Sequence, residues 1–170
     1  MITDFIPTYT GRRFDLDKII PGMIDIRDIA HSLSMTARFN GHPDKLYSVA
    51  QHSVLVSRIG DEYLLPKLLH DAPEAYTGDL VLPMKAMCPD FRLIESRIEL
   101  AIAREFHLAY NVAEIKRADD LVCVAEKRDL FANGGGWPGE LPESPHEKIT
   151  PWLPSVAEEA FLCRFHELTD

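Results

Sequence analysis

Long hydrophobic runs are missing from this 170-residue chain. No apolar stretch approaches the ~20 residues that a helix needs to cross the hydrocarbon core of a bilayer. The opening residues, MITDF, also lack the basic-then-apolar pattern of a secretory signal peptide. These two absences predict a protein that is cytoplasmic and does not interact with membranes.

Cysteine is also scarce. Cys88, Cys123 and Cys163 are odd in number, lie far apart and form no C-x-x-C pair. This pattern argues against a disulfide framework and against a zinc site built from cysteines. We therefore expect three reduced thiols, which agrees with a cytoplasmic protein.

Positive charge is in deficit. The chain has 18 Lys and Arg residues against 27 Asp and Glu, a formal net charge of −9. A protein that binds nucleic acid polymers needs a basic surface to neutralise phosphates, so this function is not expected. A small anionic substrate stays compatible, because a few local cations or a metal ion can reverse the field inside a pocket.

The spacing of apolar residues predicts helices and almost no strand. Hydrophobic residues are 46% of the chain and charged residues 26%, as in ordinary globular proteins, so residues 1–170 are expected to form one domain. We predict an all-α bundle of five to seven helices. An extended N-terminal segment covers 1–22, with a strand or hairpin at 9–14, and loops cover 77–89 and 133–154. The main predicted helices are 25–39, 48–59, 61–76, 90–107, 112–132 and 155–168.

The stretch 68–79, LLHDAPEAYTGD, concentrates polar groups that can do chemistry. On a continuous helix, Glu74 would share a face with His70 and Asp71, one turn along. Thr77-Gly78 would end that helix and leave Asp79 in the exit loop. A His-Asp dipeptide alone is more often a hydrogen-bonded pair than a metal site.

Two further residues change that balance. His52 lies among apolar neighbours in one predicted helix and Asp119 in another. Each alone would be an ordinary buried histidine or solvated aspartate. Together with the His-Asp pair they place two imidazoles and two carboxylates on facing helices, a set that can hold a divalent cation. Mixed nitrogen and oxygen ligands suit Mn²⁺, Co²⁺, Zn²⁺ or Fe²⁺ better than Mg²⁺ or Ca²⁺.

The order His, His-Asp, Asp resembles the signature of the HD-domain metal-dependent phosphohydrolases. Within them the chain is similar to bacterial 5′-deoxynucleotidases and to small phage dATP triphosphohydrolases. The blocks that carry the resemblance lie within residues 25–130 and are ARF at 37–39, QHS at 51–53, HDAPE with TGD at 70–79, and KRAD with a following leucine at 116–121. The resemblance implies an HD-domain helical bundle that forms a homo-oligomer, either a dimer or a hexamer.

The resemblance also implies a set of metal ligands. One divalent transition-metal ion (Mn, Co, Zn or Fe) would be bound by His52, His70, Asp71 and Asp119. Other members of the superfamily fit less well. Alarmone hydrolases carry a second acid where Ala75 stands, and cyclic-dinucleotide phosphodiesterases carry a Gly-Tyr-Pro motif that this sequence lacks.

The remaining site residues are implied by the same resemblance. Glu74 would be the general acid or base, and Asp79 would contact the sugar. Arg38 and Lys85 would bind the phosphate. Phe39 stands where the deoxynucleotidases carry tryptophan and would help to exclude a ribose 2′-hydroxyl.

The expected function is hydrolysis of the 5′-phosphoester of a deoxynucleotide. The sequence leaves two products open: orthophosphate from a deoxynucleoside monophosphate, or tripolyphosphate from a triphosphate such as dATP. Positive charge beyond the α-phosphate, from Arg12, Arg13, Lys85 or a neighbouring subunit, would decide between them. The alternative is a catalytically silent HD-fold module that binds a nucleotide and regulates a partner.

Overall fold

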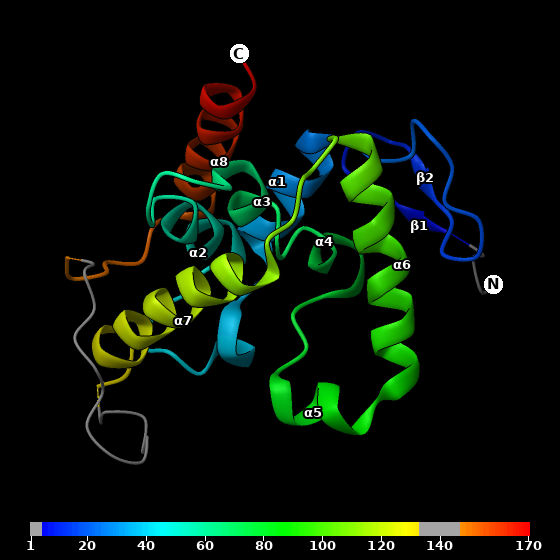
Figure 1. Ribbon diagram of the computed structural model, residues 1–170. Helices are drawn as coiled ribbons and strands as arrows, with labels where there is room; N and C mark the ends of the chain where they lie inside the picture. The colour runs from blue at the N-terminus through cyan, green and yellow to red at the C-terminus, as the bar shows by residue number, and fades with distance from the viewer. Residues whose placement is uncertain (1–4, 133–146) are drawn as a thin grey trace.

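The computed structural model describes residues 5–132 and 147–170. In these two ranges the chain forms eight α-helices, one 3-10 helix and two short strands, so the all-α class is confirmed (Figure 1). The elements are β1 (Ile6–Pro7), β2 (Arg13–Phe14), α1 (Ile26–Met35), η1 (Arg38–Gly41), α2 (Val49–Val56), α3 (Leu64–Leu68), α4 (Glu74–Thr77), α5 (Leu82–Met87), α6 (Pro89–Glu105), α7 (Val112–Asp129) and α8 (Pro154–Thr169).

The N-terminal strands form a small antiparallel hairpin, in which Ile6 pairs with Phe14. Gly11 lies in the turn at φ 83°, a conformation that glycine adopts without steric cost. The hairpin was predicted at 9–14. Phe14 anchors it, because its ring is fully buried and stacks on Tyr76 with a centroid separation of 3.8 Å.

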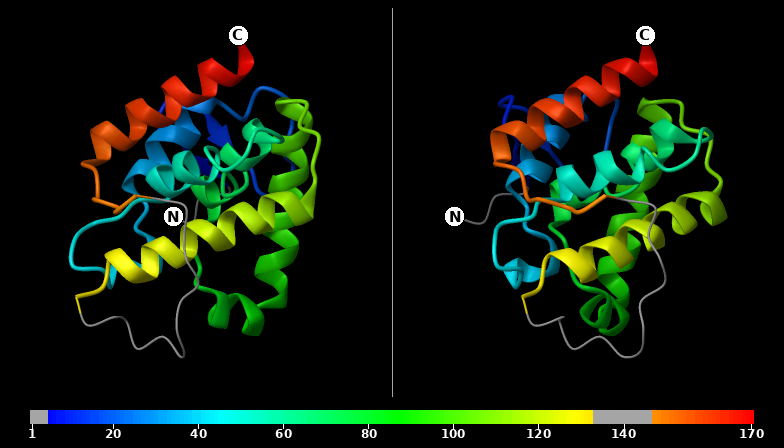
Figure 2. Two further views of the ribbon diagram at one scale, coloured as in Figure 1. Left: turned by 60° about the vertical axis from the view of Figure 1, so that its left-hand side comes forward. Right: turned by 90° about the vertical axis from the view of Figure 1, so that its left-hand side faces the viewer.

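The main hydrophobic core lies where α8 packs across α1, α2 and α3. Figure 2 shows α8 lying over these three helices, on the opposite side from α7. Leu33, Val54, Leu69 and Phe161 are fully buried in this cluster and come from four different parts of the chain. The helix that ends the chain therefore holds together three helices from its first half.

The sequence predicted one continuous helix over 61–76, and this prediction is wrong. The segment is split into α3 and α4, and residues 69–73 form a turn between them. Pro73 explains the break, because it has no N–H for the carbonyl of Leu69 and its ring clashes with that carbonyl in a continuous helix. His70 and Asp71 consequently lie in the turn, and Glu74 begins the next helix.

One of the two predicted loops also differs. The segment 77–89 contains α5, whose Pro83 lies in the first turn, where a missing N–H costs nothing. Helix α5 and the split of the predicted helix 61–76 raise the number of α-helices in the described ranges to eight, above the predicted five to seven. Of the predicted loop 133–154, residues 133–146 lie outside the described residues. Residues 147–153 are irregular as expected, and α8 begins directly after them.

In the ranges that the structure describes, no helix combines the length and the apolar character needed to cross a membrane. All three cysteines have free thiols, as predicted.

Truncating Phe161, whose buried ring projects from α8, should reveal how much the stability of the core depends on this helix. We expect Phe161→Ala to lower the free energy of unfolding by about 3–5 kcal/mol, since it removes a fully buried aromatic side chain. The control is Val156→Ala on the same helix, which is 46% exposed and should change stability by less than about 0.5 kcal/mol. Urea unfolding followed by circular dichroism measures both. Equal losses in the two variants would contradict the assignment of the core.

Asp25 should make stability depend on pH in acid. It caps α1 by accepting from the Arg27 amide, and its Oδ2 lies 2.8 Å from both Arg27 Nη2 and Arg12 Nη2. The hydrogen bond from the Arg27 side chain is the largest cause that lowers the pKa of Asp25 to about 2. A lowered carboxyl pKa stabilises the fold above the unfolded pKa of 3.8, and the gain is lost as pH falls toward 2.

The matched variant is Asp25→Asn, which keeps a good capping residue and removes the titrating charge together with one acceptor oxygen. The difference in unfolding free energy between the two proteins should be constant above about pH 4–5 and shrink below it. Unfolding curves at a series of pH values measure this. A difference that persists unchanged to pH 2 would show that the charge of Asp25 is not what stabilises the fold.

Candidate metal centre

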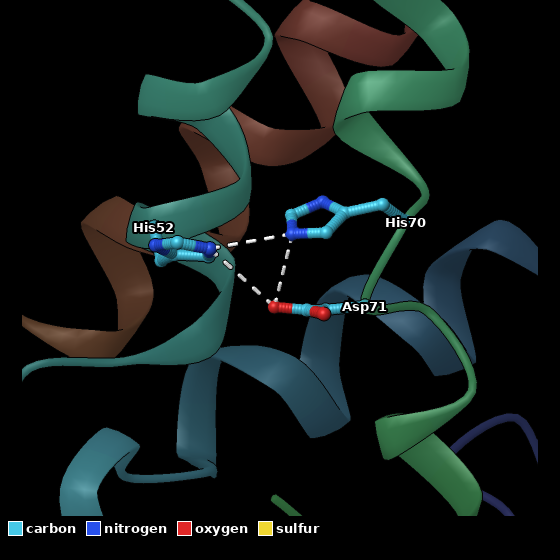
Figure 3. A group of neighbouring side chains, drawn as sticks. All are labelled: His52, His70 and Asp71. Atoms are coloured by element: carbon cyan, nitrogen blue, oxygen red, sulfur yellow. Dashed lines mark hydrogen bonds and ion pairs between the residues drawn. The ribbon is translucent and has the colours of Figure 1, made fainter. Parts of the chain in front are cut away.

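Three side chains from two parts of the chain meet in a group that can hold a metal ion. His52 projects from α2, whereas His70 and Asp71 come from the turn between α3 and α4 (Figure 3). Nε2 of His52 lies 3.3 Å from Nε2 of His70 and 3.4 Å from Oδ2 of Asp71. Nε2 of His70 lies 3.2 Å from the same carboxylate oxygen. One ligand atom of each residue thus lies within 4.8 Å of the others.

Asp119, the fourth predicted ligand, reaches the same group from α7. Its Oδ1 lies 3.3 Å from Nε2 of His52, and its side chain is 29% exposed. Burial raises the pKa of Asp119, but the hydrogen bond and charge of His52 outweigh burial and lower it to about 2. The carboxylate is therefore ionised and borders solvent, so the centre is open on this side.

In each histidine, the contact made by Nδ1 fixes the direction in which Nε2 points. Nδ1 of His70 donates to the carbonyl oxygen of Lys67 at 2.8 Å, so its Nε2 is left as the acceptor that faces His52. Nδ1 of His52 lies 2.5 Å from Oε1 of Glu126. Two acceptor nitrogens 3.3 Å apart need either a proton or a cation between them, and this donor set of imidazole and carboxylate suits a divalent transition metal.

Glu126 is the main site residue that the sequence reasoning missed. It is fully buried on α7, and its second oxygen lies 3.2 Å from Nη2 of Arg38. Burial raises the pKa of this carboxyl, but His52 and Arg38 outweigh burial and lower it to about 2. A signal existed: Glu126 follows Asp119 by seven residues, two helical turns, and so lies on the same face of α7. A carboxylate that orients a metal-binding histidine is a common supporting contact.

The charges of the group favour a cation. Burial and Arg38 lower the pKa of His52, yet Glu126 and Asp119 overcome them and raise it to about 9. Burial likewise raises the pKa of Asp71, but His70, His52 and Arg38 hold it well below its usual range. Three ionised carboxylates and one guanidinium therefore surround the imidazoles. The excess of negative charge attracts a proton or a metal ion to the centre.

Arg38, the predicted phosphate contact, lies beside the group. Its Nη1 is 3.3 Å from Oδ2 of Asp71, and its Nε has no hydrogen-bond partner among the described residues. The turn that follows it is unusual, because Phe39, Asn40 and Gly41 all have positive φ, at 54°, 52° and 72°. A non-glycine residue in this conformation costs on the order of 1–3 kcal/mol, so the surrounding contacts must hold the turn in place.

Phe39 supplies one of those contacts. Its half-buried ring meets Phe131 edge to face, with a centroid separation of 5.4 Å, and Arg38 lies over it at 5.2 Å. The ring also packs against the cluster of Tyr47 and Leu130. The structure thus ties the aromatic residue after Arg38 to the C-terminal end of α7.

Glu74 and Lys85 form a second pair beside the metal centre. Oε1 of the nearly buried Glu74 lies 3.2 Å from Nζ of Lys85, which also contacts Glu95 at 2.7 Å. The other oxygen, Oε2, is buried without a hydrogen-bond partner in the described ranges. Burial is the largest cause that raises the pKa of Glu74 to about 9, followed by the charges of Asp71 and Asp79.

The predicted residue Asp79 lies in the exit loop after α4, where it is half-buried. Burial raises its pKa, and Arg38 is the largest opposing influence. The structure thus brings Asp79 into the electrostatic environment of the candidate metal centre, although its side chain forms no hydrogen bond or ion pair with a candidate ligand in the described part of the chain.

Removing the charge of Glu126 should weaken metal binding. We expect Glu126→Gln to lower the affinity for Mn²⁺ by about 10–100-fold, since His52 would lose the carboxylate that orients its ring. Isothermal titration calorimetry measures the affinity, and circular dichroism checks that the variant folds. Glu105→Gln, an exposed carboxylate on α6, is the control and should bind Mn²⁺ as the parent does. Equal affinity in Glu126→Gln and the parent would contradict the role of Glu126.

Comparison with known proteins finds relatives whose activity is not described. No protein-family model matches the chain. The chain is 37% identical to the uncharacterized protein YfdR of Escherichia coli K12 over 171 residues, which cover 98% of this chain and 96% of YfdR. It is 42% identical to an uncharacterized protein of Rhodobacter capsulatus over 121 residues, which cover 64% of this chain and 62% of that protein. The near-complete match at this identity shows that the chain belongs to the same protein family as YfdR.

Proposed function

We propose that this protein is an HD-domain metal-dependent phosphohydrolase that cleaves the 5′-phosphoester of deoxynucleotides. The observation that carries the proposal is the convergence of His52, His70 and Asp71 in one group, with Asp119 at its open side. These residues occur in the chain in the order His, His-Asp, Asp. The supports for the proposal are therefore the geometry of the group and the sequence blocks around its members.

The four residues would hold one divalent ion, Mn²⁺, Co²⁺, Zn²⁺ or Fe²⁺. When bound, such an ion supplies a water of lowered pKa and a Lewis acid for a phosphoryl oxygen. The protein's contribution is to fix the ligand atoms beforehand, which it does through Lys67 for one imidazole and Glu126 for the other.

Two cations lie where a phosphate beside the metal group would need them. Arg38 is held next to the group by Asp71 and Glu126, so its guanidinium needs little reorganisation to meet a substrate oxygen. Lys85 approaches from α5 on the side of Glu74. Positive charge held in a partly buried site stabilises the oxygens over which charge spreads as the ester bond breaks.

Glu74 is the proposed general acid or base. A proton donor or acceptor must lie within hydrogen-bond reach of the leaving oxygen or the attacking water. The carboxyl of Glu74 is buried beside the group, and one of its oxygens has no hydrogen-bond partner among the described residues. Glu74 is the first residue of α4, directly after the turn that carries two of the proposed ligands. Asp79 as the sugar contact and Phe39 as the residue that excludes a 2′-hydroxyl complete the proposal.

Arg12, Arg13 and Lys85 are the candidate cations for binding a longer phosphate chain, and they are not equally free to do so. Arg12 is bound by Asp25 and by the carbonyl of Gly22, and Arg13 lies over the ring of Phe5. Of the three candidates, only Lys85 contacts a proposed site residue. A triphosphate would therefore need further charge from another subunit, and the dimer or hexamer expected for this type of enzyme is part of the proposal.

Product analysis tests the function. The Mn²⁺- or Co²⁺-loaded protein is incubated with each deoxynucleoside mono- and triphosphate, and the released phosphate is identified. Orthophosphate from monophosphates alone makes the protein a 5′-deoxynucleotidase, and tripolyphosphate makes it a triphosphohydrolase. Binding of nucleotides to the metal-loaded protein with no release of either product would refute the hydrolase and support the silent regulatory module.

Two substitutions separate metal binding from proton transfer. Asp71→Ala should abolish turnover together with Mn²⁺ binding, because it removes the carboxylate shared by both imidazoles. Glu74→Ala should retain Mn²⁺ but slow turnover by about 10²–10⁴-fold. Glu105→Gln serves as the control with parental activity. Full activity in Asp71→Ala would overturn the site assignment.

A further inference from the structure

A second concave surface lies beside the helices that carry His52 and Asp119. Its volume is about 680 Å³, within the range of small-molecule sites. It is bounded by α2, α7 and the irregular segment 147–152, which runs between these helices in the right-hand view of Figure 2. The side chains that the inference uses are Leu55, Arg58, Arg117, Leu121, Lys148 and Trp152.

This groove is separate from the metal centre. Gln51, not its neighbour His52, faces the groove, and its amide bonds to the carbonyl of Thr150 and the amide of Trp152. On α7, Arg117 and Leu121 line the groove, whereas the intervening Asp119 reaches the metal group. A packed layer that includes Val56, Ala118 and Val122 joins the two helices. A ligand of the groove would therefore not need to touch the metal ligands.

The lining is basic although the protein is acidic. Among the described residues, Arg58, Arg117 and Lys148 line the groove against one carboxylate, Glu147, in a chain of net charge −9. Arg58 is exposed and forms no ion pair within the described ranges. Arg117 is bound by Glu114, at 3.1 Å, but is itself 53% exposed. Such a concentration of cations attracts an anion.

One end of the groove brings two cations together at a glycine. Gly60 adopts φ 71°, and a Cβ at this position would lie 3.6 Å from Nζ of Lys67 and 3.9 Å from Nη2 of Arg117. Lys67 is 1% exposed and donates to the carbonyl of Ile59 at 2.7 Å, and no carboxylate among the described residues lies within ion-pair distance of it. Burying an ammonium without a counter-charge is costly, and an anion at Gly60 would relieve that cost.

Much of the remaining wall of the groove is apolar. Leu55, Leu121 and Ile149 form part of the wall, and the half-buried indole of Trp152 completes it. A flat aromatic surface next to guanidinium groups suits a planar ring that carries a phosphate.

We propose that this groove binds a phosphorylated small molecule with a planar ring, such as a nucleotide. The phosphate lies at Gly60, between Arg58, Arg117 and Lys67, and the ring lies against Trp152. This site goes beyond the proposed hydrolase and does not depend on it.

Trp152 offers a direct readout. The chain has two tryptophans, so Trp137→Phe leaves Trp152 as the sole source of indole fluorescence. The probes are adenosine 5′-monophosphate, adenosine and inorganic phosphate, titrated with EDTA present to prevent hydrolysis. We expect saturable quenching by the monophosphate that weakens with added salt, and affinities at least about tenfold lower for adenosine and for phosphate alone.

Variants locate the binding site. Arg58→Ala and Arg117→Ala should each lower the affinity for adenosine 5′-monophosphate about tenfold or more. The control is Arg92→Ala, which replaces an exposed arginine on α6 and should bind the monophosphate as the parent does. The signal should persist in Asp71→Ala, where the metal centre is disrupted. No saturable quenching, equal binding of adenosine and its monophosphate, or loss of the signal only in Asp71→Ala would each overturn the proposal.

Discussion

The contact between His52 and Glu126 is the interaction on which the candidate metal centre depends. It joins α2 to α7 through two side chains that are completely excluded from solvent, 2.5 Å apart. The same carboxylate also receives Arg38 from the turn after α1. One buried glutamate therefore sets the direction of a ligand nitrogen, places a cation at the edge of the group and ties three segments of the chain together.

The helix break at residues 69–73 is almost as important for the geometry of the candidate metal centre. On a continuous helix, neighbouring residues point about 100° apart, so the side chains of His70 and Asp71 would leave the backbone in diverging directions. In the turn, both reach Nε2 of His52, at 3.3 and 3.4 Å. Pro73 thus contributes to the site without touching it, because it prevents the regular helix that the apolar pattern alone favours.

The sequence was sufficient for the fold class and for three residues, His52, His70 and Asp71, that meet in a group able to hold a metal ion, because both leave local signals. Helical spacing of apolar residues is repeated over most of the chain, and histidines with carboxylates in apolar surroundings stand out. The helix break at 69–73 was missed because Leu64 and Leu68 continue the helical spacing up to it. Helix α5 was missed because it is six residues long and none of them is buried.

Glu126 was missed for another reason, although its spacing of seven residues from Asp119 placed it on the same face of the helix. Glutamate is common on the solvated face of helices, and only the packing of α7 against α2 shows that this one is buried. The pairing of Lys85 with Glu74 and Glu95 has the same origin, since it requires α5 and α6 to lie beside α4. Contacts between elements that are distant in the chain are fixed by tertiary packing, which spacing along the chain does not encode.

The place of α8 in the core has a consequence for synthesis of the protein. All four candidate ligands precede residue 120, so they emerge from the ribosome well before Phe161 and its neighbours. Yet α1, α2 and α3 pack their inner faces on α8, and Gln51 is anchored by backbone groups at residues 150 and 152. A nascent chain therefore carries every ligand while the support for α2 is still incomplete. We therefore expect the candidate metal centre to take its final shape only when α8 docks, because a chain that stalls earlier carries its histidines and carboxylates on an incomplete core.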